Sequence, residues 1–198
     1  MRYSGRLLCI LLVAGLSACV SSPPIRYFSL DDGRSVAGAS KGPSVLVVRA
    51  DVPELIDRPQ LVARTANHEV RVSDLDQWAE PLRQQIPRVL ARDLGEMLDS
   101  GRVAALTTDA VAPDADFKVM LDIQRMEVVA GKTVEVDALW RVQTRSGGVF
   151  YGRSRVVEPI SDAANADDYP AMVAAQSRAL RTVASDIAAG VSRSLKGG

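Results

Sequence analysis

The chain has 198 residues, with 24 basic and 24 acidic side chains, one histidine and two cysteines. At roughly 150 residues per domain, this length predicts a single folded domain. Zero net charge excludes the basic surface that nucleic-acid binding needs, so we expect no nucleic-acid partner. A single histidine, His68, excludes a multi-histidine metal or catalytic site, and a hydrophobic fraction of 47% excludes a disordered chain.

Residues 1–18 have the features of a secretory signal peptide. Two arginines precede an apolar run of ten residues, Leu7–Leu16. As a helix this run would reach only about 15 Å, half of a bilayer core. The following Ser17-Ala18-Cys19 looks like the end of a bacterial lipobox, in which the cysteine is lipidated and begins the mature chain. The alternative is an ordinary signal peptide that carries this cysteine by chance.

Lipidation of Cys19 would anchor the mature protein through several acyl chains, palmitate among them, and one chain alone would be marginal. Lipoproteins kept in the inner membrane often carry aspartate at the next position, so Val20 favours sorting to the outer membrane, with the protein facing the periplasm. Residues 19–24 form a tether of at most about 20–25 Å. The domain of residues 25–198 therefore cannot bridge the envelope, and anything that spans the gap must be a partner.

The first half of this domain predicts strands and one helix. Residues 25–30 and 44–50 are strand-like, and residues 61–64 and 69–72 suggest a short hairpin. A helix is expected from Glu80 to Asp99, because apolar residues recur there every three or four positions. Pro81 suits its first turn, Pro87 should kink it or shift its start, and Gly101 is a plausible stop.

The second half predicts a three-strand meander and a final helix. Apolar and polar residues alternate over 117–124, 134–142 and 149–157, with glycine-containing turns between these segments. The last helix is expected over Pro170–Ser194, with Asp168 as its cap. The fold class is therefore α+β, an antiparallel-rich sheet with two main helices packed on one face.

Several segments stand in a characteristic order along the chain. They are the lipobox, Tyr27–Leu30, Val52–Arg64, Trp78–Leu82, and Asp168–Val173 with the helix ending in Ser185–Ala188. This order resembles the ABC-type transport auxiliary lipoproteins, the paraquat-inducible protein C-like family. The most specific parts of the resemblance are Asp57-Arg58-Pro59-Gln60 and the segment that begins at Trp78.

The resemblance implies a periplasm-facing lipoprotein of the outer membrane. Relatives accompany an inner-membrane ABC permease and a mammalian-cell-entry (MCE) domain protein, in systems that move phospholipid or other hydrophobic molecules between membranes. We therefore expect an auxiliary subunit that docks a periplasm-spanning partner and supports membrane integrity. A ring-like homo-oligomer is a further expectation, since closed symmetry lets a modest domain surround a channel. The alternative is a structural envelope lipoprotein without a transport role.

Asp57, Arg58, Pro59 and Gln60 are the candidate partner-binding residues. Two prolines, Pro53 and Pro59, stiffen this segment, and a rigid exposed loop loses less entropy on docking. The competing interpretation is a loop held by a local Asp57–Arg58 salt bridge.

No catalytic residues, metal ligands or cofactors are expected. His68 lies among turn residues, and Gly152–Val156 begins like a nucleophile elbow but reads as a strand. The acidic pairs Asp31-Asp32 and Asp167-Asp168 are typical of caps and turns. A periplasmic hydrolase would need a nucleophile and a base that this sequence does not supply. Trp78 has two interpretations, a core residue at the helix start or a grip on a lipid chain.

Overall fold

The computed structural model describes residues 23–30, 33, 41–65, 68–106, 114–161, 165 and 167–197. Its elements, in chain order, are β1 (Arg26–Phe28), β2 (Val45–Asp51), β3 (Gln60–Arg64), β4 (Val70–Trp78), α2 (Leu82–Met97), β5 (Val103–Ala105), β6 (Phe117–Val129), β7 (Thr133–Thr144), β8 (Val149–Pro159) and α3 (Tyr169–Gly197). The signal peptide, Cys19 and Asp31-Asp32 lie outside the described residues.

The eight strands form one mixed sheet, so the prediction of an antiparallel-rich sheet is wrong in this respect. The pairs β6–β7, β7–β8 and β3–β4 are antiparallel, whereas β1–β4, β2–β5, β2–β6 and β3–β6 are parallel. The antiparallel pairs join strands that follow one another through short turns. The parallel pairs join strands separated by long connections, and β2 reaches β6 only after α2 and β5 have intervened. Alternation within a strand carries no information about such distant pairings.

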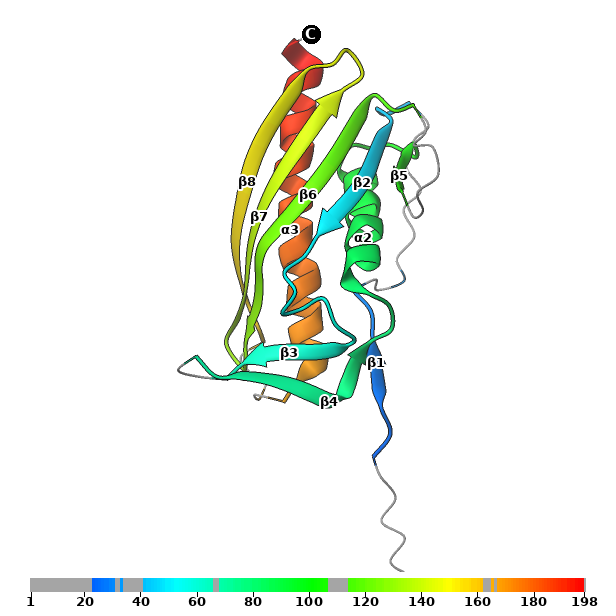
Figure 1. Cartoon of the computed structure of the whole chain (residues 1–198). Coiled ribbons are helices and arrows are strands. Elements are labelled where there is room, and N and C mark those ends of the chain that lie inside the picture. The colour runs from blue at the N-terminus through cyan, green and yellow to red at the C-terminus, as the bar shows by residue number, and fades with distance from the viewer. Residues whose placement is uncertain are drawn as a thin grey trace, which may run out of the picture.

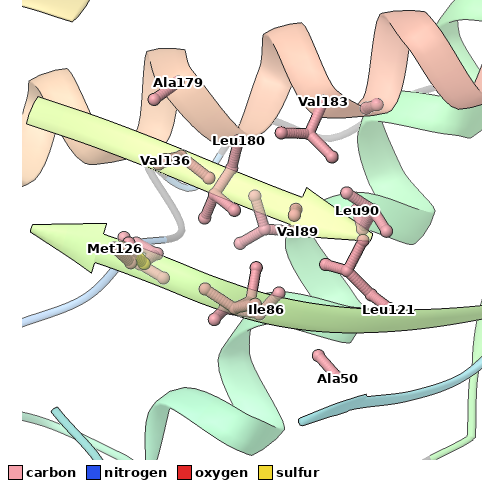
Figure 2. Close-up of a cluster of buried hydrophobic side chains, with 14 of the residues drawn as sticks. Ala50, Ile86, Val89, Leu90, Leu121, Met126, Val136, Ala179, Leu180 and Val183 are labelled. Carbon is pink, nitrogen blue, oxygen red and sulfur yellow. The ribbon is translucent and has the colours of Figure 1, made fainter. Parts of the chain in front are cut away.

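Two helices cover one face of this sheet, as predicted. Figure 1 shows both helices behind the strands, with α3 running along β6, β7 and β8 and α2 lying beside β2 and β5. Figure 2 shows apolar side chains of both helices in the core, with Ile86, Val89 and Leu90 from α2 and Leu180 and Val183 from α3. None of the helices that the structure describes is long and apolar enough to cross a membrane.

The meander is confirmed and its strands are longer than expected. β6 and β7 pair over nearly their full lengths, with one bulge between Ile123 and Arg125. The two turns contain Gly131 and Gly147 with φ of 67° and 91°, the left-handed region in which glycine is favoured. Gly152–Val156 lies within β8, so it is a strand and no elbow. The short strand β5 was not predicted, because its three residues contain no alternation.

Helix α2 differs from its prediction at both ends. It begins at Leu82, and Pro81 is the residue before the first turn instead of a member of it. The helix passes through Pro87 and ends at Met97, with Leu98 as its C-cap, so Gly101 is not the stop. Asp99 follows with φ of 47°, and the Ser100 N–H donates to the Gly95 carbonyl at 2.9 Å. This is the left-handed closure usually made by glycine, here made by aspartate.

Helix α3 agrees with its prediction more closely. It extends from Tyr169 to Gly197, and the Asp168 carboxylate accepts a hydrogen bond from the Ala171 N–H at 2.9 Å. Asp168 is therefore the expected cap. The neighbouring Asp167 forms an ion pair with Arg71 at 2.7 Å, so the acidic pair has structural roles.

Asp116 joins the starts of β2 and β6. Its Oδ2 accepts hydrogen bonds from the Ser44 N–H at 2.8 Å and the Ser44 hydroxyl at 2.7 Å. The Ser44 backbone bond is the main reason why the pKa of Asp116 is lowered. The hydroxyl bond and the positive charges of Arg145 and Arg102 also lower it. The ionised form is thus favoured by the fold.

A lowered pKa in the folded state stabilises the protein above the unfolded pKa of about 3.9, and this contribution is lost as the pH falls through the folded value. Asp116→Asn should therefore reduce the free energy of unfolding at neutral pH, and its difference from wild type should shrink under acid conditions. Urea midpoints at neutral pH and well below the unfolded pKa measure this. The control is Asp114→Asn, because Asp114 is exposed and has no bond to Ser44. If both variants lose the same free energy of unfolding at neutral pH, the hydrogen bonds from Ser44 to Asp116 do not stabilise the fold.

Candidate functional site

The candidate site is a hollow at the corner where β4 leads into α2. Residues Asp57–Pro59, Trp78–Pro81 and Arg83 line it, and it encloses about 290 Å³. Its two segments are distant in the sequence but are brought together by the β3–β4 pairing, in which Gln60 lies opposite Gln77. The Trp78 N–H also donates to the Pro59 carbonyl at 2.6 Å. The two segments with the most specific sequence pattern therefore form one surface.

Asp57 is held by helix α2 and not by its neighbour in sequence. Its carboxylate accepts from Arg83 Nε at 3.2 Å and from the second guanidinium nitrogen at 2.5 Å. Such a bidentate pair fixes the loop relative to the first turn of the helix. The interpretation of a local salt bridge between Asp57 and Arg58 is therefore wrong. Arg83 was missed, because nothing in the sequence indicates which helical arginine meets the loop.

Arg58 is exposed, and among the described residues no acidic side chain forms an ion pair with it. The carboxylates around it are already paired, Asp57 with Arg83 and Glu80 with Arg88. Pro59 is also exposed, whereas Gln60 is half-buried as the first residue of β3. The predicted residues Asp57–Gln60 are thus contiguous on one surface, where Arg58 is a cation without an intramolecular counter-charge among the described residues.

The first described strand is attached to the same corner. Phe28 of β1 lies opposite Trp78 of β4, and the Ala79 N–H donates to the Phe28 carbonyl at 2.8 Å. Gln85 of α2 completes the attachment. Its amide nitrogen donates to the Glu80 carbonyl at 2.6 Å, and its oxygen accepts from the Leu30 N–H at 2.9 Å. Gln85 is only 2% exposed, so its amide group bonds to these two backbone groups instead of to water.

Gln85 was also missed, although the sequence contains a signal for it. It lies three residues after Leu82 and four before Val89, within the apolar stripe of the helix. A polar residue at such a position requires a partner. The sequence indicates that need but does not identify Leu30 or Glu80.

Trp78 ends β4 and is buried, 5% exposed, so it is a core residue and does not lie on the helix as expected. A small space of about 10 Å³ beside it is lined by residues of the 56–62 segment, β6, the start of α2 and the start of α3, including Tyr169 and Met172. The segment Asp168–Val173 therefore contributes to the same end of the domain as the hollow.

The described residues contain no group of three or more histidine, cysteine or acidic side chains that could hold a metal ion. His68 is exposed in the β3–β4 turn with φ of 72°. A surface turn position agrees with the interpretation of His68 as a turn residue. The hollow therefore presents one cation, Arg58, that no described acidic side chain neutralises.

The family of ABC-type transport auxiliary lipoprotein components matches residues 28–188. Among solved structures, an uncharacterized protein has 16% identity and a TM-score of 0.67, over 85% of this chain and 99% of that one. A Xanthomonas campestris protein of the DUF330 family has 22% identity and a TM-score of 0.54, over 83% and 90%. These two share the fold.

A PelC dodecamer from Paraburkholderia phytofirmans is more distant, with 11% identity and a TM-score of 0.40 over 76% of this chain and 93% of that one. This likeness is too low to carry an argument about the present chain. The search of curated proteins found no significant match to the present chain. Because the family match spans most of the sequence, from β1 into α3, the chain belongs to the family of ABC-type transport auxiliary lipoprotein components.

Proposed function

We propose that this protein is the outer-membrane lipoprotein subunit of an ABC/MCE-type lipid transport system. It is anchored through Cys19, faces the periplasm and docks a periplasm-spanning MCE-domain protein that works with an inner-membrane permease. Membership of a transport-auxiliary family supports the general role. Phospholipid or another hydrophobic molecule is the proposed cargo, and the protein supports the integrity of the membrane.

The short tether supports docking as the function of the folded domain. From Cys19 to Ile25 the chain extends at most about 20 Å, and a domain of this size has a radius of gyration near 16 Å. The domain therefore stays beside its own membrane. A transport system that joins two membranes needs a second protein to cross the gap, and this subunit must bind it.

The observation that carries the proposal is the charge balance of the hollow. Asp57 and Glu80 are neutralised by arginines of α2, and Arg58 alone lacks an acidic partner among the described residues around it. A planar guanidinium on a rigid loop is suited to bind a carboxylate or a pair of carbonyls of another protein. We therefore place the docking site at Asp57–Gln60, with Arg58 as its central contact.

Arg58→Glu should weaken the association of the membrane-anchored protein with its MCE partner about tenfold or more, because it removes a charge-assisted contact and introduces repulsion. The thermal midpoint should change little, since Arg58 is exposed and forms no ion pair with a described acidic side chain. Pull-down from detergent extracts, with a sizing run and a thermal melt, measures both effects.

The matched control is Arg193→Glu, which makes the same charge change on an exposed residue near the end of α3, at the opposite end of the domain. Equal partner binding by wild type, Arg58→Glu and Arg193→Glu would refute the contact. If neither an MCE protein nor a permease is recovered from cross-linked membranes with the wild type, the structural-lipoprotein alternative is favoured.

A further inference from the structure

The edge strand β1 and its neighbour β4 form a paired segment, here called the ribbon, that has two different faces. The parallel register places Arg26 beside Asp76 and Phe28 beside Trp78. On this first face Arg26, whose side chain is 53% exposed, bonds to the buried Asp76 at 2.6 Å and lies 5.7 Å from the centre of the Phe28 ring. This face is thus satisfied within the domain.

The outward face consists of the alternate residues. Tyr27 lies beside Gln77, and Ile25 and Leu75 each stand two residues before this pair along their own segment of the chain. Ile25, Tyr27 and Leu75 are 46%, 64% and 37% exposed, so the paired segment of β1 and β4 exposes three large apolar side chains. We name these three residues the ribbon patch. It shares no residue with the lining of the hollow at Arg58.

We infer that the ribbon patch lies against the lipid headgroup region of the membrane that holds the anchor. This inference rests on the proposed lipidation of Cys19. Ile25 is the sixth residue after Cys19, so the patch begins within about 20 Å of the acylated cysteine. The ribbon is also at the end of the domain from which the chain runs toward its N-terminus (Figure 1).

The side chains of the ribbon patch suit a bilayer interface better than water. A tyrosine has an apolar ring and a polar hydroxyl, and such side chains gather at the level of lipid headgroups. Isoleucine and leucine beside it would bury their apolar surface among the upper acyl segments. Contact through the patch would hold the domain in one orientation, whereas a tether alone would leave it free to rotate.

Depth-sensitive labelling of the processed, lipidated protein tests this inference. A single cysteine is introduced by Tyr27→Cys, Leu75→Cys or Tyr151→Cys and labelled with the fluorophore NBD. The protein is then reconstituted into phosphatidylethanolamine–phosphatidylglycerol vesicles that contain headgroup spin-labelled lipid. Tyr151 is the matched control, because it is a 72% exposed tyrosine and the third residue of β8, a strand that begins at the end of the sheet opposite β1 (Figure 1).

A lipidated Cys19 cannot react with the label, and Cys9 leaves with the signal peptide, so wild type should remain unlabelled. We expect NBD at positions 27 and 75 to shift to shorter wavelengths and to lose about half of its emission to the spin-labelled lipid, as at headgroup depth. NBD at position 151 should show neither change.

Other outcomes overturn the inference in distinguishable ways. If the protein floats with the vesicles but NBD at positions 27 and 75 behaves like NBD at position 151, the ribbon patch faces water. The inference is then wrong, whereas the proposed lipid anchor is supported. A blue shift without quenching by lipid would mean that a second copy or a partner protein covers the patch. If neither the wild type nor Cys19→Ala floats with the vesicles, Cys19 is not a lipid anchor. Both the proposed anchor and this inference would then be wrong.

Discussion

Gln85→Leu is expected to lower the free energy of unfolding by about 2–4 kcal/mol, because the buried Leu30 N–H and the partly buried Glu80 carbonyl lose their partner. The Leu30 N–H and the Glu80 carbonyl both bond to the Gln85 amide, and Leu30 is 0% exposed. Leucine has nearly the same volume but cannot replace either bond. The loss should also loosen β1 from the start of α2. Urea unfolding measures the first effect, and faster tryptic cleavage at Arg26 measures the second.

The matched control for this prediction is the preceding residue. Gln84 is exposed on the same helix, so Gln84→Leu makes the same chemical change without removing a buried bond. It should alter the free energy of unfolding by less than about 0.5 kcal/mol. Equal losses in both variants would mean that Gln85 contributes no more than a surface glutamine.

Local patterns predict much of this fold, because they depend on neighbouring residues. The meander β6–β7–β8 follows from alternation and two glycine turns, and α3 from its apolar stripe and the Asp168 cap. Such signals act within a few positions of the chain. The element types predicted in these regions are therefore confirmed.

Contacts between distant segments could not be predicted in the same way. The parallel partners of β6 and the short strand β5 depend on where α2 directs the chain. The Arg83 partner of Asp57 is 26 residues away, and several arginines of α2 were equally plausible from the sequence. The resemblance thus singled out both segments that line the hollow, whereas their position side by side and the role of Arg83 follow from the tertiary structure alone.

Gly152→Ala is expected to destabilise the fold by about 3 kcal/mol, near the upper end of overpacking effects. Gly152 lies directly opposite Trp140 in the β7–β8 ladder, and the indole lies across the space that a side chain would occupy. A Cβ at this position would be 2.5 Å from Cε2 of Trp140 and closer still to Cζ2 and Cη2. An aromatic ring that covers a strand glycine is a known way to stabilise an edge strand such as β8.

The Trp140 ring has little freedom to avoid this clash. Its Nε1 donates to Ser154 Oγ at 3.1 Å, Phe150 meets it edge-on at 6.4 Å between ring centres, and α3 approaches it closely at Gly190. The strain must therefore shift β8 or α3, which explains the large expected cost. Thermal and urea unfolding of Gly152→Ala measure it, with Gly197→Ala as a control in which the added Cβ meets nothing within 4 Å.

A double-mutant cycle separates this clash from any general effect of alanine on β8. In a Trp140→Leu background the indole is gone, so Gly152→Ala should cost much less than in the wild type, and the two losses should be non-additive by at least about 1 kcal/mol. If alanine costs the same in both backgrounds, the cause lies in the β8 backbone and the proposed contact with Trp140 is wrong. If the two losses are non-additive, Gly152 is needed because it leaves room for the Trp140 indole. The same indole lies close to Gly190 of α3, so Gly152 would then also support the packing of α3 on the sheet.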